Sequence, residues 1–224
     1  VRVRSPDAIA DEMLARSKVT GVTHAFIVDS VFNVPRSHAL EVCEALIARG
    51  TPLPWVCYGS PVAFDDTLVE AMVRAGCAGV EIGADAGSAA MLRKLRKPFG
   101  IAEILETRRL FLRHGLADCY TFVLGAEGET PEQVRETLSF VDALDPNVAA
   151  FLVFTEDREA RTGGCSEHRR AILEILAREA PRRPGWVVPE LGIRFGRKLT
   201  RVVERHRVRG PAWLWLARQR RLGL

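Results

Sequence analysis

Short apolar runs alternate with amphipathic stretches along the first two thirds of the chain. The apolar runs are too short for buried helices and predict strands that are buried on both faces. The predicted strands cover residues 25–28, 55–58, 79–83, 119–124 and 149–154. A first helix is expected to begin at Pro6, followed by helices over residues 37–48, 65–75, 88–95, 101–114 and 131–144. Strands that each lead into a helix predict right-handed βαβ units and one parallel sheet.

Polar residues and glycines gather where the predicted strands end, which is where parallel sheets place their chemistry. These segments are Asp29, Tyr58–Ser60, Glu81–Ser88, Gly125–Thr130 and Thr155–Asp157. Loops after strands are polar in any protein of this class, so helix capping is the competing explanation for each position. Asp29, for example, is a candidate cap and a candidate cofactor contact.

The segment from Val80 to Ser88 carries two carboxylates among glycines. Glu81 follows an apolar residue of the strand, so its side chain lies on the opposite face. A carboxylate inside a closed barrel is costly unless it meets a cation or a ligand hydroxyl or amine. A buried ion pair is the structural alternative. Because Asp85 and Ser88 continue the polar run, we favour a ligand site.

The segment from Leu124 to Glu132 closes a strand and opens a helix. Capping by Thr130 and Pro131 explains the helix start. It does not explain why Gly125, Gly128 and Glu129 crowd the end of the strand. Glycines there let the backbone approach a flat or anionic ligand.

Composition excludes several classes of protein. Apolar residues make up 47% and charged residues 27% of the 224 positions, as in ordinary globular proteins. No apolar stretch approaches the roughly twenty residues of a membrane span. The five cysteines are 14, 20, 42 and 46 residues apart, and the histidines are scattered, so no metal-ligand spacing occurs. The odd cysteine count and wide spacing indicate a reducing compartment, and we expect a cytoplasmic location.

Charge divides the chain into two regions. Residues 1–157 carry 15 basic and 22 acidic side chains, whereas residues 158–224 carry 17 basic and 6 acidic ones. The second region predicts helices over residues 167–180, 195–207 and 211–222, with extended segments at 186–189 and 193–195. Three roles remain open for it: a cap on the barrel, a contact with an anionic membrane surface through Trp and Arg, and RNA binding. No RNA-binding motif is visible, so no nucleic-acid partner is expected.

Several of these stretches, taken in order, resemble a known family. The matching residues are Arg4-Ser5-Pro6 with Asp11-Glu12, Val28-Asp29 with Phe32-Asn33, Ala75-Gly76-Cys77 before Val80–Gly83, Gly87-Ser88 with Leu92, Leu95 and Lys97, and Leu124–Glu132 with Thr137, Leu138 and Phe140. Their order and spacing resemble the radical S-adenosylmethionine (SAM) enzymes, particularly the subgroup with a cobalamin-binding domain. The resemblance covers about residues 2–157.

The resemblance implies a partial (β/α)6 TIM-like barrel over residues 1–157, followed by a basic, helix-rich extension over residues 158–224. The family's CxxxCxxC loop, which binds a [4Fe–4S] cluster, does not occur in this sequence. We expect that loop and the first barrel strand upstream of Val1, since the first residue is not Met. A relative that has lost its cluster is the alternative.

The resemblance also implies roles for individual residues. It places the SAM methionine near Asp29. It places the ribose near Glu81, Asp85 and Ser88, and the adenine near Leu124, Gly125 and Glu129. Two positions depart from the family pattern. Asp85-Ala86 stands where family members commonly have Glu-Ser, and the shorter carboxylate puts the ribose contact in question. Glu127 replaces the usual proline between Gly125 and Gly128, which puts the rigidity of that loop in question. No catalytic residue and no metal ligand are assigned.

The implied activity is reductive cleavage of SAM to a 5′-deoxyadenosyl radical that abstracts a substrate hydrogen. Cobalamin-dependent methyl transfer is one outcome that the resemblance allows. The expected partners are a small-molecule or lipid-like substrate and an external electron donor. Two other classes remain open: a non-radical (β/α)-barrel enzyme that uses the strand-end carboxylates, and a non-catalytic barrel remnant that serves as a binding module.

Overall fold

The computed structural model describes residues 3–155, 165–194, 201, 204–205 and 207–221. Its centre is one parallel sheet of six strands that follow each other in sequence order, β1 to β6. The strands are β1 (Ala25–Ile27), β2 (Trp55–Gly59), β3 (Cys77–Asp85), β4 (Ala117–Leu124), β5 (Val148–Val153) and β6 (Trp186–Val187). All five strands predicted from the sequence are therefore confirmed, with small differences at their ends.

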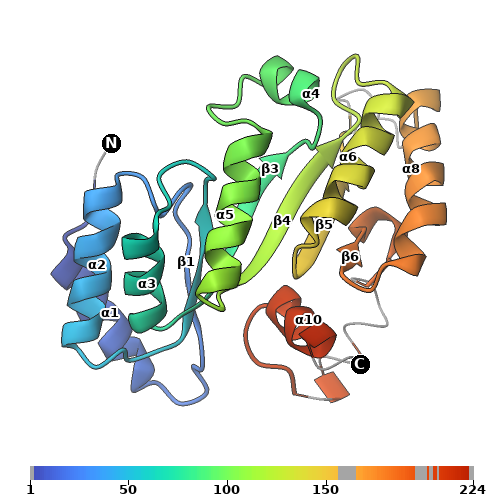
Figure 1. Ribbon diagram of the computed structural model, residues 1–224. Coiled ribbons are helices and arrows are strands. Elements are labelled where there is room, and N and C mark those ends of the chain that lie inside the picture. The colour runs from blue at the N-terminus through green and yellow to red at the C-terminus, as the bar shows by residue number, and fades with distance from the viewer. Residues whose placement is uncertain (1–2, 156–164, 195–200, 202–203, 206, 222–224) are drawn as a thin grey trace.

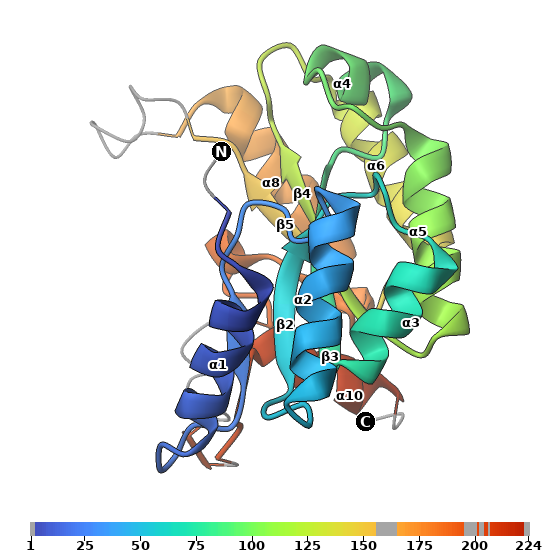
Figure 2. The same ribbon diagram turned by 90° about the vertical axis from the view of Figure 1, so that its left-hand side faces the viewer.

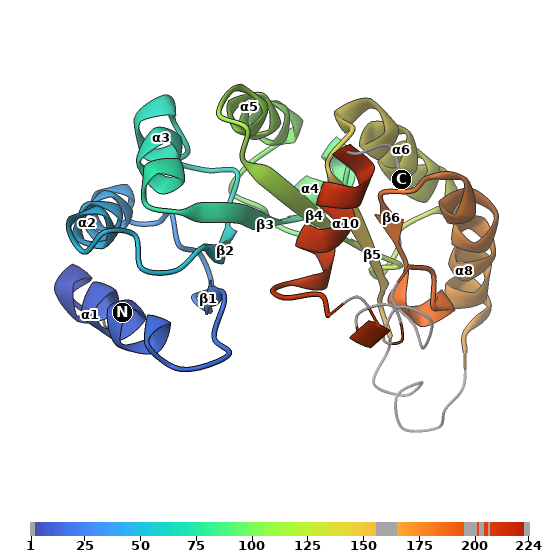
Figure 3. The same cartoon turned by 90° about the horizontal axis from the view of Figure 1, so that it is seen from below.

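Helices cover one face of this sheet, and the sheet curves away from them (Figures 1 and 3). The helices are α1 (Pro6–Ser17), α2 (Arg36–Ala48), α3 (Asp66–Arg74), α4 (Ala89–Lys94), α5 (Ile101–Arg113), α6 (Pro131–Leu144), α8 (Glu167–Glu179) and α10 (Ala212–Arg221), with short 3₁₀ turns η1 (Ala180–Arg182) and η2 (Pro189–Leu191). A parallel α/β sheet in a partial-barrel arrangement confirms the predicted fold class.

Alternation along each strand assigns its residues to two faces. On β5, Ala149, Phe151 and Val153 point toward the covering helices and belong to the main hydrophobic core. Val148 and Ala150 point the other way and contact α10. We call the helix-covered side the convex face and the opposite side the concave face.

Helix starts agree closely with the capping signals in the sequence. Ser5 Oγ accepts from the amide of Ala8, and Thr130 Oγ1 accepts from the amide of Gln133, whose side chain accepts from the amide of Thr130 in return. Each cap satisfies amides that the first helical turn leaves without partners. These local bonds fix where α1 and α6 begin, and α6 in turn fixes the loop that follows β4.

The sheet continues past residue 157, where the sequence changes in charge. The sixth strand, β6, comes from the basic region and pairs in parallel with β5. The sequence predicted an extended segment at 186–189 without placing it in the sheet. Residue 157 and most of the helix predicted over residues 195–207 lie outside the described part of the chain.

The last described helix, α10, lies on the concave face, on the opposite side of the sheet from α3 and α5 (Figure 3). Trp213, Leu214 and Ala217 are buried there against Val56, Ala117, Cys119, Val148 and Val187. On β2, β4 and β5 these residues lie in the first half of the strand, so α10 covers the end of the sheet opposite to the carboxyl edge. Among the described helices, none is long and apolar enough to cross a membrane.

Candidate functional site

The carboxyl ends of β1, β3 and β4 share one edge of the sheet, as expected for parallel strands. The register shows how the predicted site residues sit along that edge. Glu81 pairs with Tyr58 on β2 and with Cys119 on β4, in the middle of the sheet. Asp85 ends β3 and pairs with Phe122 after an irregularity in the ladder. Asp85 therefore lies at the edge, whereas Glu81 lies four residues earlier on the same strand.

Asp85 adopts a left-handed backbone conformation, with φ of 63°. Aspartate is among the few residues that tolerate this region, because its short side chain can bond locally. Its carboxylate forms an ion pair with Lys97, which follows α4, and Lys97 also lies 5.7 Å from the centre of the Phe99 ring. The pair is about three-quarters buried. Lys97 therefore holds the carboxylate over the end of β3, and a ligand hydroxyl would have to share it.

Ser88 places a buried hydroxyl at this edge. It is the N-cap residue of α4 and fully buried, yet its hydroxyl caps no amide. Within the described residues, Ser88 Oγ has no hydrogen-bond partner. Buried hydroxyls without partners are rare because each costs free energy. A bound molecule that hydrogen-bonds Ser88 would remove this cost.

The turn around Ser88 is tied to α6. The amide of Gly87 donates to Thr137 Oγ1 at 3.1 Å, and a Cβ added to Gly87 would lie 2.6 Å from the Phe140 ring. A larger residue at position 87 would therefore collide with α6. The β3–α4 turn and α6 consequently form one unit, which brings Ser88 toward the loop after β4.

That loop is built around Glu129, which is only 3% exposed. Glu129 Oε2 accepts from the amide of Gly125 at 2.5 Å, and the amide of Glu129 donates to the carbonyl of Ala126 at 2.9 Å. Gly125 has φ of 85°, a conformation that favours glycine. Glu129 thus stabilises the backbone conformation of the loop at Leu124 and Gly125.

The electrostatics of Glu129 follow from this burial. Desolvation raises the pKa of its carboxyl group, and the hydrogen bonds from the Gly125 and Ala126 amides oppose the rise. Its second oxygen, Oε1, has no partner among the described residues. The sequence assigned Glu129 to the adenine region. In the structure, one carboxylate oxygen of Glu129 accepts a hydrogen bond from the loop backbone, and the other has no partner among the described residues.

Asp29 lies at the other end of the edge, after β1. It is exposed, and its Oδ1 accepts from the amide of Ser30 at 2.8 Å. It lines a groove of about 550 Å³ between α1, β1 and α2, the two helices that stand in front of the sheet in Figure 2. Two strand positions separate Asp29 from Asp85. The structure therefore does not place them side by side, although they share the same edge.

Glu81 belongs to the concave face. Its Oε1 accepts from the indole Nε1 of Trp213 on α10 at 2.6 Å. Burial raises the pKa of the Glu81 carboxyl group, and the indole hydrogen bond opposes this effect. Neither Trp213 nor the role of Lys97 against Asp85 could be found from periodicity, because both contacts join segments that are distant in sequence or separated by a turn. Only the Gly-rich spacing around Asp85 pointed to this edge.

The described cysteines do not offer a cluster site. Cys43, Cys57, Cys77 and Cys119 are buried free thiols, and burial raises the pKa of Cys57 and Cys119 well above the usual value. No group of three His, Cys, Asp or Glu side chains could hold a metal ion within the part of the chain that the structure describes. The residues present therefore do not fit a [4Fe–4S] cluster.

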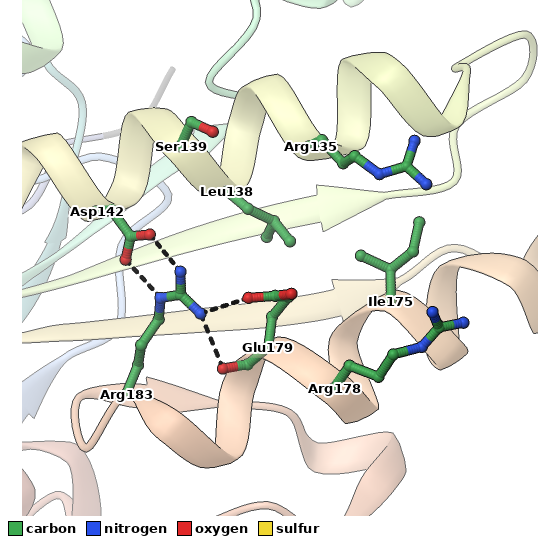
Figure 4. Close-up of a pocket in the computed structure, with 8 residues that line it drawn as sticks. All are labelled: Arg135, Leu138, Ser139, Asp142, Ile175, Arg178, Glu179 and Arg183. Carbon is green, nitrogen blue, oxygen red and sulfur yellow. Dashed lines mark hydrogen bonds and ion pairs between the residues drawn. The ribbon is translucent and has the colours of Figure 1, made fainter.

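A hollow on the convex side of the molecule serves a structural role. It lies between α6 and α8, and Arg183 crosses it to bind both Asp142 and Glu179 (Figure 4). The guanidinium carbon of Arg183 is also 4.4 Å from the centre of the Trp186 ring. Arg183 is neutralised by these two carboxylates, so it fastens α8 and β6 to α6.

Comparison with known proteins assigns the chain to a family. Residues 1–141 match the family model of the radical SAM superfamily. The chain belongs to the radical SAM superfamily. This assignment confirms the resemblance seen in the sequence.

Two curated relatives are each 30% identical to this chain. They are tryptophan 2-C-methyltransferase of Streptomyces laurentii, over 66% of this chain, and anaerobic magnesium-protoporphyrin IX monomethyl ester cyclase of Cereibacter sphaeroides, over 69%. The matched parts are only 27% and 26% of those proteins. This radical SAM chain therefore spans about a quarter of the relatives it resembles.

Solved structures show the same relationship. The radical SAM methyltransferase TsrM from Kitasatospora setae, solved with cobalamin and a [4Fe–4S] cluster, is 26% identical, with a TM-score of 0.62 over 67% of this chain and 29% of TsrM. The cobalamin-dependent enzyme OxsB, at 14% identity and a TM-score of 0.53, shares the fold. Cobalamin-dependent radical SAM enzymes are thus among the structural neighbours.

Proposed function

We propose that this chain forms the SAM-binding part of a radical SAM enzyme, with SAM at the carboxyl edge of the sheet between the β3–α4 turn and the β4–α6 loop. The observation that carries the proposal is the fully buried Ser88 hydroxyl, which has no hydrogen-bond partner among the described residues. It lies three residues after Asp85, which ends β3. SAM carries ribose hydroxyls and an amine that can bond both side chains, so the residues fit this cofactor.

Each element of the edge has a separate task in this proposal. Ser88 and Asp85 bind the ribose, with Lys97 keeping Asp85 in place. The backbone at Leu124 and Gly125, braced by Glu129, forms a flat wall for the adenine. Asp29, at the far end of the edge, receives the methionine part. Glu81 lies below this edge, on the concave face.

SAM supplies a 5′-deoxyadenosyl radical or a methyl group to a substrate in enzymes of the kind proposed. The cluster that such chemistry requires finds no ligand set in the described residues, so the proposal covers what this chain itself holds and orients. Cobalamin, an electron donor and a small-molecule or lipid-like substrate belong to the proposal for the longer protein. The location in the cytoplasm and the division at residue 157 stay predictions.

The basic region takes part in the same architecture. Trp213 and Leu214 are buried against the sheet, and Arg220 binds Asp145 and the carbonyl of Pro146. These contacts favour a role for α10 as a cap on the concave face. Contact of the remaining basic residues with an anionic membrane surface stays a prediction.

Isothermal titration calorimetry of SAM binding to the 224-residue chain tests the proposal. Ser88→Ala removes one neutral hydrogen bond and should weaken binding about fivefold. Asp85→Ala removes a charged one and should weaken binding by about 1–3 kcal/mol. Ser139→Ala, an exposed change on α6, is the matched control and should bind SAM like the parent chain.

Two results would contradict the proposal. Absence of SAM binding by the parent chain would reject the site as a whole. Unchanged SAM affinity in Asp85→Ala and Ser88→Ala, with earlier thermal unfolding, would show that both residues only stabilise the turn. The chain would then be better described as a barrel remnant that binds another molecule.

A further inference from the structure

The concave face of the sheet exposes large apolar side chains above α10. Phe26 on β1 and Tyr58 on β2 are 39% and 37% exposed, and their ring centres are 4.9 Å apart. Leu152 on β5 is 39% exposed on the same face. Between them, β3 and β4 present the small residues Gly83 and Thr121. The middle of the concave face therefore carries small side chains, with larger apolar side chains on the strands at either side.

Glu81 is the exception on this surface. On the concave positions of the described strands, before the carboxyl edge, no other side chain is charged. No lysine, arginine or histidine of the described residues forms an ion pair with it; its bond is to the neutral indole of Trp213. A partly buried carboxylate without a cation is costly, and proteins keep such groups where a ligand supplies the missing charge.

Trp213 fixes the position of this carboxylate. Its ring packs closely against Gly79 near the start of β3, where an added Cβ would lie 2.4 Å from Trp213 Cη2. The indole N–H of Trp213, on α10, donates a hydrogen bond to Oε1 of Glu81. The carboxylate is thus held in one place at the floor of the apolar surface, with Tyr58 and Cys119 as its neighbours in register.

We propose that Glu81 recognises the ammonium or N–H group of a small-molecule substrate whose remainder is apolar and about the size of one ring. The negative charge of Glu81 selects a hydrogen-bond donor or a cation and disfavours an anion. The exposed rings of Phe26 and Tyr58 suit a flat apolar group, since aromatic pairs and cation–π contacts add to area burial. The inference rests on the proposed function, because it names the substrate class that would lie below SAM.

Three probes of matched size test this selection on the 224-residue chain. They are 2-phenylethylamine, 2-phenylethanol and 3-phenylpropanoate, titrated by saturation-transfer NMR and by the fluorescence of the chain's tryptophans. The amine should bind about fivefold or more tightly than the alcohol, and the anion most weakly, as for a charge pair that is partly exposed. Glu81→Gln, which keeps shape and the indole contact, should remove the preference.

Two further variants separate charge from structure. Glu70→Gln alters an exposed carboxylate on the outer side of α3 and should keep the preference for the amine. Trp213→Phe deletes the hydrogen bond that positions Glu81 but keeps the carboxylate, so the preference for the amine should shrink without vanishing. Equal affinity for the three probes in the parent chain, or an unchanged preference in Glu81→Gln, would overturn the inference.

SAM titration distinguishes this inference from the proposed function. If Glu81→Gln weakens SAM binding as much as Asp85→Ala does, Glu81 contacts the cofactor, as the sequence resemblance implies, and the substrate assignment fails alone. If the amine preference depends on Glu81 but the parent chain binds no SAM, the proposed function fails and the recognition of a cationic ring compound stands.

Discussion

A carboxylate on one face of the sheet is paired with a cation, whereas a carboxylate on the other face bonds a neutral group. Asp118 and Glu81 lie on neighbouring strands, one register position apart, on opposite faces. Asp118 on the convex face is fully buried, and Arg108 Nη1 donates to it at 2.8 Å. The amide of Asn147 donates to its other oxygen at 2.7 Å. Glu81 on the concave face is partly exposed and has an indole N–H where Asp118 has a cation.

This difference separates stability from binding within a single sheet. The convex face is filled by large apolar side chains and by charges that already have their partners. Among the described residues, the concave face keeps exposed rings and a carboxylate without a paired cation, whereas a buried hydroxyl without a partner occurs on both sides, Ser88 at the carboxyl edge and Tyr120 on the convex face. Functional sites commonly retain such unsatisfied groups, because a ligand completes them. Mutations on the two faces should therefore differ in kind as well as in size.

Neighbouring residues of β5 give the strongest contrast. Phe151 is fully buried on the convex face, stacked 5.6 Å from Phe122, whereas Leu152 faces the concave side. Phe151→Ala should lower the free energy of unfolding by about 3–5 kcal/mol, since it leaves a large cavity. Leu152→Ala should cost less than about 1 kcal/mol. Urea unfolding measures both, and equal losses would show that the concave side chain is as tightly packed as the core.

The two carboxylates extend the contrast to charge. Asp118→Ala strands Arg108 as an unpaired buried cation and should cost about 3–5 kcal/mol. Glu81→Gln keeps a hydrogen-bond acceptor for Trp213 and has no cation to strand, so its cost should stay below about 1 kcal/mol. Thermal or urea unfolding provides the comparison. A large loss in Glu81→Gln would mean that its charge supports the fold.

Most of the fold was predictable from the sequence because its signals are local. Four-residue apolar runs such as 25–28, glycines after helices and the caps at Ser5 and Thr130 each act within a few residues. The sixth strand was not predictable as part of the sheet. β6 is two residues long, and its pairing with β5 depends on how α8 packs on α6, which Arg183 secures from 41 residues away in sequence.

The candidate site was predictable only as a location. Strand ends with glycines pointed to Asp85, Ser88 and Gly125, and their order along the chain identified the family. The partners of these residues were not predictable, because Lys97 reaches back across α4 and Trp213 lies 132 residues from Glu81. Long-range contacts of this kind leave no periodic signal. The face that a residue occupies follows from alternation, but the group that meets it there does not.

The packing of α10 on the concave face gives a smaller expected effect. Gly79→Ala places a Cβ within 2.4 Å of the Trp213 ring and 3.0 Å of the Ala117 carbonyl, so α10 must shift. Overpacking of this kind costs about 1–3 kcal/mol. Gly83→Ala, on the same strand and face, meets nothing closer than 3.8 Å and is the control. The emission maximum of tryptophan fluorescence should shift in Gly79→Ala and stay constant in Gly83→Ala. An equal loss of unfolding free energy in both variants would contradict this packing.

The smallest expected effect concerns Glu129 and depends on pH. Burial raises the pKa of this carboxyl group in the folded chain above its usual value of 4.5. The folded state then binds more protons than the unfolded state between the two values, so stability falls as pH rises through this range. The contribution of Glu129 to stability is complete below pH 4.5 and is lost as pH passes the raised value.

Glu129→Gln tests this sign, because glutamine can accept from the Gly125 amide but cannot titrate. The parent chain should be most stable relative to Glu129→Gln at low pH, and the difference should shrink steadily as pH rises from 4.5 toward neutrality. Urea unfolding at a series of pH values measures the difference. Leu152→Ala, which removes no titrating group, should show a constant difference over the same series. A difference that grows with pH in Glu129→Gln would mean that the Gly125 and Ala126 amides outweigh burial and that Glu129 is held as a carboxylate throughout.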